Sequence, residues 1–286
     1  MKALLIGLPL LLAAPAFAES YPEAKRVLSL GGSVTEIIYA LGEQDRLAGR
    51  DQTSTWPVEA MELADVGYLR SLSPEGVLSV SPDLIIAEEG AGPPEAVAVR
   101  KEAGIPYVTV AEEYDADGVL TKVDAIADAL GVPDEGKKLH DQLQMQLAEA
   151  SKRAETVDQP KKVLFILSLQ GQRVMAGGTG TATNGIIQLA GAENALSGLD
   201  GYKPITDEAI IGAAPDVILM MRRGDAEADS NHGADKDAAL ALPVLAQTPA
   251  GINGAVVIID GLKLLGFGPR TGEAATELHD LIYGAS

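Results

Sequence analysis

One stretch of this sequence occurs twice, and this repeat constrains the fold more than any other feature. Residues 67–87 read GYLRSLSPEGVLSVSPDLIIA, and residues 201–220 read GYKPITDEAIIGAAPDVILM. A shift of 133 positions superimposes Glu75 on Glu208, together with a Pro-Asp pair and most of the apolar positions. A match of this length indicates an internal duplication, so we expect two similar α/β lobes.

Each copy predicts a loop, a short helix and a buried strand. In the first copy, Ser73 is typical of a helix N-cap, and Pro74 suits the first helical position. The apolar run at residues 84–86 is typical of a strand buried in a parallel sheet. A tyrosine precedes the helix in both copies, Tyr68 in the first and Tyr202 in the second.

The longest helical pattern lies between the two copies. Residues 134–156 place Leu139, Leu143 and Leu147 on one stripe, and at ~1.5 Å per residue this helix would exceed 30 Å. We therefore predict an N-terminal lobe at residues 19–130 and a C-terminal lobe at 159–286. A rigid connecting helix within 131–158 would join these two Rossmann-like lobes, with a ligand site where their loops face each other.

The first eighteen residues have the features of a secretory signal peptide. Lys2 is followed by an apolar core at residues 3–14, which is too short to span a bilayer, and then by the small-residue motif at 16–18. The sequence therefore predicts an exported periplasmic protein that is cleaved near Ala18.

Composition excludes several functions. The 41 acidic residues outnumber the 22 basic ones and give a net charge of −19, which disfavours nucleic acid as a partner. No cysteine is present, so disulfides and thiolate sites are excluded. The sequence contains neither a G-x-S-x-G nucleophile elbow nor an H-E-x-x-H metal motif, and we predict that the protein is not an enzyme.

The lobes, the connecting helix and several short stretches together resemble the periplasmic substrate-binding proteins that deliver vitamin B12, ferric siderophores or haem to ABC importers. The resemblance covers the whole mature chain, and the stretches look most like the haem-binding branch. These stretches are VGYLR at 66–70, AGGTGTA at 176–182, GYKP at 201–204, MRRG at 221–224, LPVLAQTPA at 242–250 and LLGFGPR at 264–270.

The resemblance implies that haem b (hemin) is the transported ligand and that Tyr68 is the axial ligand of its iron. Tyrosinate is a known axial ligand of haem iron. A free phenol titrates near pH ~10, and both the iron and nearby Arg70 would favour the phenolate. Arg222 and Arg223, at the end of a predicted strand, suit the haem propionates.

Other predicted contacts are less specific. Trp56, Met221 and Phe267 are candidates for the walls of the haem cleft, and Tyr202 is either a second wall or a packing residue. His232 lies in a polar insertion at 225–237 and is an alternative axial ligand. A corrinoid or a ferric siderophore remains the alternative cargo on the same scaffold.

The duplicated glutamates have two interpretations. Each follows a Ser or Thr cap in the first turn of a helix, where a carboxylate interacts favourably with the helix dipole, by ~0.3–1 kcal/mol. In the vitamin B12 and siderophore relatives, a glutamate on each lobe docks into arginine pockets of the permease dimer. The resemblance therefore implies that Glu75 and Glu208 dock this protein, which we expect to be a monomer, onto an inner-membrane ABC permease.

Overall fold

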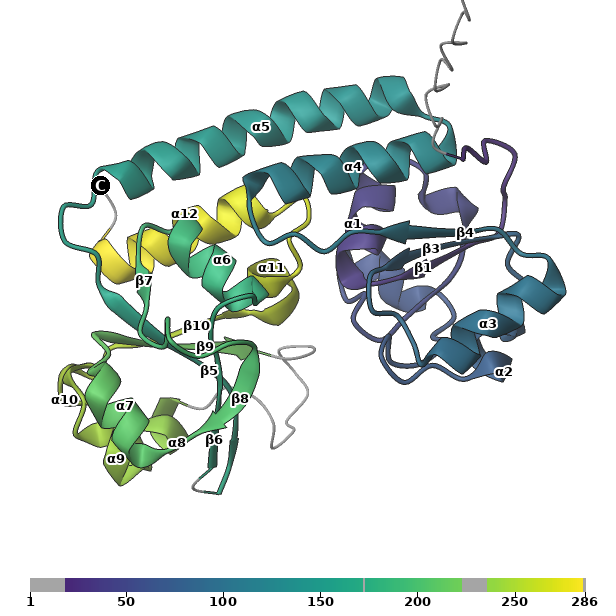
Figure 1. The fold of residues 1–286 in the computed structure, drawn as a ribbon. Coiled ribbons are helices and arrows are strands. Elements are labelled where there is room, and N and C mark those ends of the chain that lie inside the picture. The colour runs from purple at the N-terminus through teal and green to yellow at the C-terminus, as the bar shows by residue number, and fades with distance from the viewer. Residues whose placement is uncertain (1–18, 172, 223–235, 285–286) are drawn as a thin grey trace, which may run out of the picture.

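The computed structural model describes residues 19–171, 173–222 and 236–284, and each lobe contains one sheet (Figure 1). In the N-terminal lobe all neighbouring strands are parallel, in the order β2-β1-β3-β4. The strands are β1 (Val27–Leu30), β2 (Leu47–Arg50), β3 (Leu84–Glu88) and β4 (Tyr107–Val110), and the accompanying helices are α1 (Gly32–Ala40), α2 (Pro74–Ser79) and α3 (Pro94–Ala103).

The C-terminal lobe has a six-stranded mixed sheet in the order β10-β9-β5-β6-β8, with β7 beside β5. Its strands β5, β7, β9 and β10 are parallel, whereas β6 is antiparallel to both β5 and β8. They are β5 (Lys162–Gln170), β6 (Arg173–Gly177), β7 (Glu193–Asn194), β8 (Tyr202–Ile205), β9 (Val217–Arg222) and β10 (Val256–Asp260).

The α/β fold class is confirmed, but this antiparallel part was not predicted. The second copy of the repeat begins with an edge strand, β8, where the first begins with a loop. The reason is that β6 offers a free edge, which residues 202–205 pair with in register from Gly177↔Tyr202 to Val174↔Ile205.

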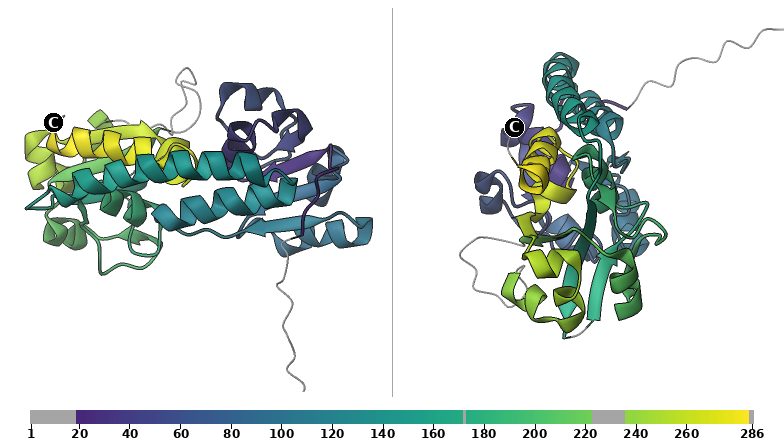
Figure 2. Two further views of the ribbon diagram at one scale, coloured as in Figure 1. Left: turned by 90° about the horizontal axis from the view of Figure 1, so that it is seen from above. Right: turned by 90° about the vertical axis from the view of Figure 1, so that its left-hand side faces the viewer.

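Two long helices lie side by side along one side of the molecule. α4 (Ala116–Leu130) packs on α5 (Pro133–Glu155), and α5 extends across both lobes (Figures 1 and 2). The predicted stripe of α5 is buried, since Leu139, Leu143 and Leu147 are each 8% exposed or less. The other face of α5 carries charged side chains, so this helix is amphipathic: its apolar stripe packs on the protein and its charged face meets solvent.

The remaining helices belong to the C-terminal lobe, and α12 also packs against α5. They are α6 (Ala182–Leu189), α7 (Asp207–Ala213), α8 (Lys236–Ala241), α9 (Pro243–Ala246), α10 (Pro249–Asn253), α11 (Gly261–Leu265) and α12 (Thr271–Tyr283). Within the three described ranges, no helix combines the length and apolar character needed to cross a bilayer.

One hydrophobic cluster runs through both lobes. It contains Val27 and Ile86 from the N-terminal sheet, Leu143 from α5, and Phe165 and Leu219 from the C-terminal sheet. The opposite face of each sheet has a smaller cluster of its own. Because the central cluster is shared, the two lobes are packed together along α4, α5 and α12 and do not have separate cores.

The helix starts in the two copies are equivalent, as predicted. The Ser73 side chain accepts a hydrogen bond from the Gly76 N–H at the start of α2. The Thr206 side chain accepts one from the Ala209 N–H at the start of α7. Each cap satisfies one of the free N–H groups of its helix.

Gly185 allows α6 to approach the segment that leaves the N-terminal sheet. A Cβ at this position would lie 2.1 Å from the Tyr114 carbonyl oxygen and 2.9 Å from the Phe267 ring. We predict that Gly185→Ala destabilises the protein by about 1–3 kcal/mol and lowers its melting temperature in calorimetry. Gly212→Ala on α7 is the control, since it meets nothing within 4 Å and should be neutral or stabilising. An unchanged melting temperature for Gly185→Ala would contradict this packing.

Candidate functional site

The Tyr68 loop is held by backbone hydrogen bonds while the Tyr68 ring is exposed. The Leu72 N–H donates to the Gly92 carbonyl (2.9 Å), and the Gly92 N–H donates to the Leu69 carbonyl (3.0 Å). Leu69 is buried beneath the loop, whereas Tyr68 is 44% exposed. The phenol is therefore presented on a supported loop, which lowers the entropic cost of ordering it when a ligand binds.

Arg70 lies in the same loop with its guanidinium at the surface. Its Nη1 donates to the carbonyl of Gly90 in the loop after β3, at 3.4 Å. A Cβ on Gly90 would lie 2.6 Å from this Nη1, so the glycine lets the guanidinium lie close to the backbone. The role of Arg70 toward the Tyr68 phenolate stays a prediction.

Tyr114 is the residue near this loop that sequence reasoning missed. It lies between β4 and α4, and its ring packs edge-on against Phe267, with centroids 5.4 Å apart. Burial, the nearby Glu112 carboxylate and Tyr202 raise the pKa of Tyr114, Arg70 lowers it, and the net result is a pKa of about 12. Because the Tyr114 ring packs on Phe267 and its carbonyl lies against Gly185 of α6, the two lobes contact each other at this segment. Tyr114 lies outside both repeats, so the duplication gave no signal for it.

Tyr202 is partly a packing residue and partly exposed. Its hydroxyl shares a hydrogen bond of 3.0 Å with Thr183 on α6, and its ring meets Phe165 edge-on at 6.5 Å. Even so, 39% of the residue is exposed. These contacts hold the ring at the edge of the C-terminal sheet, so it can still form a wall.

The two other predicted aromatic walls differ from each other. Phe267 is 1% exposed and sits in the central cluster, so the expectation of an open wall residue is not met there. Its ring fills the space between α6 and Tyr114, which accounts for its burial. Trp56 is 47% exposed, and the Arg270 guanidinium lies 4.9 Å from its ring centroid in a cation–π contact.

The predicted propionate partners fall at the end of β9. Arg222 is the last residue of that strand, exposed, and in register with Asp260 of β10. Met221 precedes it and is half-buried. Arg223 and His232 lie outside the described residues.

The loop between α11 and α12 docks on α1. We call this contact the interlobe junction and define it by Glu36 and Lys122 of the N-terminal lobe and by Gly266 and Arg270 of the C-terminal lobe. Arg270 Nε donates to Glu36 at 3.0 Å, and Glu36 is only 5% exposed. Burial outweighs the effect of Arg270 and raises the pKa of Glu36 to about 7.

Lys122 supplies the second polar contact of the junction. Its fully buried ammonium donates to Glu112 (2.5 Å), to the Ser33 hydroxyl (3.1 Å) and to the Gly266 carbonyl (3.5 Å). The Ser33 hydroxyl in turn donates to Glu88 at the end of β3 (2.5 Å). Burial and the neighbouring Glu112 raise the pKa of Glu88. The ammonium is thus compensated by a carboxylate and neutral oxygens, as a buried charge requires.

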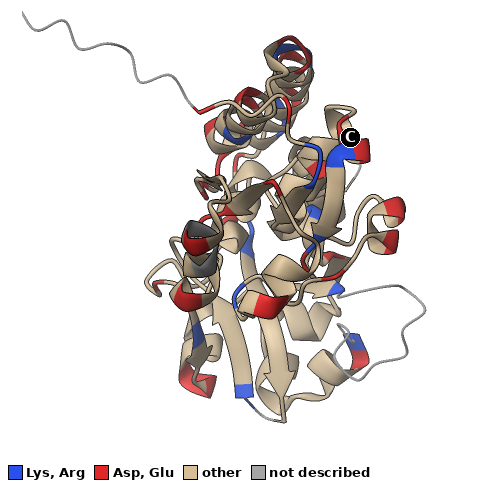
Figure 3. Cartoon of the chain, turned by 90° about the vertical axis from the view of Figure 1, so that its right-hand side faces the viewer, with Lys and Arg blue, Asp and Glu red and all other residues tan. Residues whose placement is uncertain are grey.

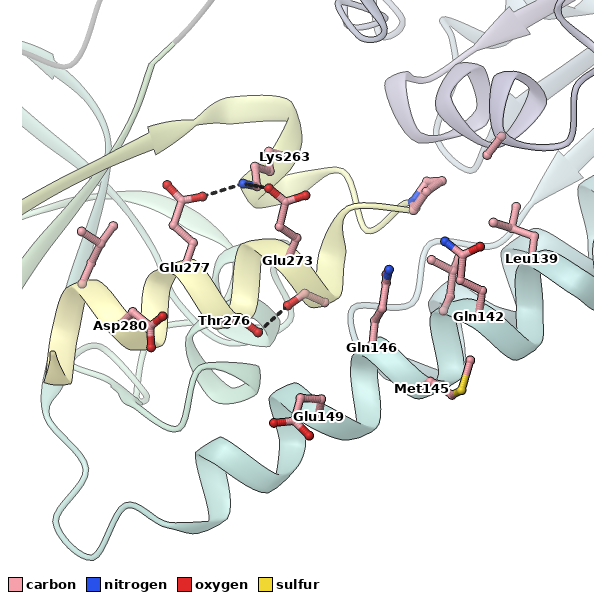
Figure 4. A pocket seen from close by; sticks show the side chains of 15 residues that line it. Leu139, Gln142, Met145, Gln146, Glu149, Lys263, Glu273, Thr276, Glu277 and Asp280 are labelled. Atoms are coloured by element: carbon pink, nitrogen blue, oxygen red, sulfur yellow. Dashed lines mark hydrogen bonds and ion pairs between the residues drawn. The ribbon is translucent and has the colours of Figure 1, made fainter. Parts of the chain in front are cut away.

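A groove of about 1080 Å³ lies elsewhere, between α5 and α12 (Figure 4). None of the predicted site residues lines it. Its charged groups are already paired, since Lys263 bridges Glu273 and Glu277 and Asp280 pairs with Arg153. Acidic residues outnumber basic ones in the sequence and lie in both lobes (Figure 3). The exposed cations Arg70 and Arg222 are therefore better suited to bind an anionic ligand than this acidic groove.

A family model described as periplasmic binding protein matches residues 27–261. The chain belongs to this family. Two solved structures are similar to it over most of its length. The periplasmic haem-binding protein BhuT, in complex with two haems, is 41% identical over 90% of this chain and 97% of that one, with a TM-score of 0.83. The apo periplasmic haem-binding protein RhuT from Roseiflexus sp. RS-1 is 38% identical over 91% and 98%, with a TM-score of 0.84.

Curated proteins with similar sequences include transport proteins that are named for a cargo other than haem. An ABC transporter substrate-binding lipoprotein of Bacillus subtilis is 30% identical over 200 residues, which is 69% of this chain and 63% of that protein. Several vitamin B12-binding proteins of Vibrio and Yersinia also match. These relatives and the structural neighbours are substrate-binding transport proteins and not enzymes.

The raised pKa of Glu36 predicts a pH-dependent contribution to stability. A buried carboxyl whose pKa rises from 4.5 to about 7 stabilises the fold fully below pH 4.5 and loses that contribution as the pH rises through 7. Glu36→Gln removes this titration. In urea unfolding, the stability of the variant relative to wild type should therefore increase between pH 4.5 and 8.

The surface variant Glu23→Gln is the control for this measurement. Its unfolding curve should track that of the wild type across the same pH range. A Glu36→Gln stability difference that is the same at pH 4.5 and at pH 8 would show that Glu36 does not titrate in this window.

Proposed function

We propose that this protein binds haem between its two lobes and delivers it to an ABC permease in the inner membrane. The observation that carries this proposal is the likeness to haem-binding proteins over about nine-tenths of the chain, at up to 41% identity. We infer further that it is exported by a signal peptide cleaved near Ala18 and acts as a monomer without catalytic activity. Haem b is cargo here, with no catalytic cofactor beside it.

Tyr68 is the proposed iron ligand. It is exposed, it sits on a supported loop, and tyrosinate is an anionic oxygen donor suited to ferric iron. Tyr114 has the opposite properties, because burial raises its pKa to about 12 and keeps its phenol protonated. Tyr114 therefore suits a hydrogen-bond donor to the cargo better than an iron ligand.

The rest of the proposed site combines apolar walls with cations. Trp56, Tyr202 and Met221 offer the flat apolar surface that a porphyrin needs, and buried apolar area supplies most of the binding energy of such ligands. Arg70 and Arg222 are exposed cations on opposite lobes and are the proposed partners of the two propionates, with Arg223 a further candidate from the sequence.

A corrinoid or a ferric siderophore is the alternative cargo, favoured by the vitamin B12-binding relatives. A corrinoid carries cobalt in place of iron, and a ferric siderophore surrounds its iron with its own donor atoms, so neither offers Tyr68 the iron of a porphyrin. Titration of the purified protein with hemin, cyanocobalamin and a ferric siderophore separates the cargos, since only one should bind in the submicromolar range.

Docking to the permease is proposed to use Glu75 and Glu208. Both carboxylates are exposed, and they occupy equivalent positions on α2 and α7. Hydrogen bonds from its own N–H and from Thr206 lower the pKa of Glu208 and keep it ionised. Because α5 and the interlobe junction hold the lobes together, the separation of the two carboxylates is nearly constant, and such charges guide association with a cationic partner.

The iron ligand is tested by hemin titration of Tyr68→Phe. We expect loss of the tyrosinate-to-iron charge-transfer band and at least tenfold weaker binding, because a phenyl ring offers no oxygen to the iron. Tyr202→Phe is the matched variant in the other lobe and should keep the band. A normal spectrum in Tyr68→Phe, or transfer of the defect to Tyr202→Phe, would overturn the assignment.

The docking role is tested with the double variant Glu75→Ala/Glu208→Ala. Hemin affinity and melting temperature should match those of wild type, since both side chains lie on exposed helix faces. Growth of the source bacterium on hemin as the iron source should be impaired. The variant Glu23→Ala/Glu43→Ala removes two other carboxylates and should grow normally. Normal growth of the Glu75/Glu208 variant would contradict the docking role.

A further inference from the structure

Each proposed docking glutamate has an exposed aliphatic side chain one helical turn later. Leu78 follows Glu75 on α2 and is 36% exposed, and Ile211 follows Glu208 on α7 and is 54% exposed. The same shift of 133 positions that superimposes the glutamates superimposes Leu78 on Ile211. Residues three apart in a helix share a face, so each Glu and its aliphatic neighbour form one small surface.

The fold itself does not require an aliphatic residue at these positions. The residues immediately before them, Val77 and Ile210, point inward and are 1% and 0% exposed. These two anchor their helices to the smaller clusters on the outer faces of the sheets. Leu78 and Ile211 are turned about 100° further around the helix axis. Their exposed apolar area is unfavourable in water and adds nothing to the core.

The pairing with glutamate is not a general property of the exposed apolar residues. The described large apolar residues that are exposed also include Trp56, Val58, Tyr68, Met145, Tyr202, Ile252 and Leu281. None of these seven has a glutamate three residues earlier, although Leu281 follows Glu277 by four positions and Met145 precedes Glu149 by four. Among the described exposed apolar residues, the spacing of three therefore occurs only where the duplication repeats it.

We propose that Leu78 and Ile211 are the apolar anchors of the permease-docking surface, each seated beside the carboxylate that precedes it. This inference rests on the proposed function and deepens it. The matching partner surface is a pair of equivalent pockets on a two-fold symmetric membrane protein, each with an apolar floor and a bordering Arg or Lys. A carboxylate guides such an approach electrostatically, while burial of the aliphatic side chain slows dissociation.

The position of the two surfaces is compatible with one flat partner. α2 and α7 lie in different lobes, both on the side of the molecule away from α5 (Figure 1). The shared core along α4, α5 and α12 restricts movement between them. A partner with two matching pockets could therefore engage both helices at once, and each contact would raise the effective concentration of the other.

The test uses hemin-loaded protein and the cognate permease in proteoliposomes, with stimulated ATP hydrolysis as the readout. Leu78→Ser/Ile211→Ser should raise the half-maximal concentration roughly tenfold or more, given the apolar area removed from the contact. Leu78→Met/Ile211→Met retains apolar area and should restore docking. Met145→Ser/Ile252→Ser removes exposed apolar residues that lie outside α2 and α7 and should behave as wild type.

Several outcomes would overturn the inference. Wild-type stimulation by Leu78→Ser/Ile211→Ser, or equal losses in the Met145/Ile252 control, would show that the two residues are ordinary surface positions. Weaker hemin binding by the Leu78/Ile211 variant would place these residues in the cargo site instead. A dimer of the wild type in sedimentation that dissociates in this variant would assign the surface to a second copy of this chain.

The same experiment separates this inference from the proposed function. If Glu75→Ala/Glu208→Ala loses stimulation while Leu78→Ser/Ile211→Ser keeps it, docking through the glutamates stands and the apolar anchors do not. If the wild-type protein fails to bind hemin or to stimulate the permease, the proposed function fails first.

Discussion

The buried contact between Glu36 and Arg270 joins the two lobes beside the hydrophobic cluster that runs through both of them, and it fixes how the lobes meet. A buried pair gains little net stability, because removing both charges from water is costly. Its directional hydrogen bonds nevertheless specify how the α11–α12 loop lies on α1. Lys122 reinforces that seating by reaching from α4 to the Gly266 carbonyl. The polar groups at the junction thus specify how the lobes meet. The apolar core that the lobes share supplies the stability.

The candidate site takes its shape from this junction. Arg270 is bound to Glu36 on one side and lies over the Trp56 ring on the other, so the position of this exposed ring is linked to the contact between the lobes. Tyr114 lies in the segment between β4 and α4, and its pKa is affected by Arg70 and Glu112 of the N-terminal lobe and by Tyr202 of the C-terminal lobe. A ligand that binds there would touch residues whose separation is already set, which suits a carrier that must present a constant surface to its partner.

The two copies of the repeat have kept some features and lost others. Helix caps, glutamates and exposed aliphatic residues recur at equivalent positions on α2 and α7. Tyr68 and Tyr202 do not remain equivalent, because one lies in a loop and the other on an edge strand. The features that recur lie on the exposed faces of α2 and α7, and the features that differ lie in the segments that precede these helices.

The sequence by itself determined the α/β class, the two lobes, the long helix between them and the capped starts of α2 and α7. These features depend on local periodicity and on side chains within four residues of one another, which a linear pattern records directly. It also placed Tyr68 in a loop. Only the tertiary structure decided that Phe267 is buried, that Tyr202 lies on a strand, and that Tyr114, Lys122 and Arg270 lie where the lobes meet. Glu36 and Arg270 are 234 residues apart in the chain. A contact between residues so far apart in the sequence depends on how the sheets and α5 pack. The hydrophobic periodicity of either segment does not predict it.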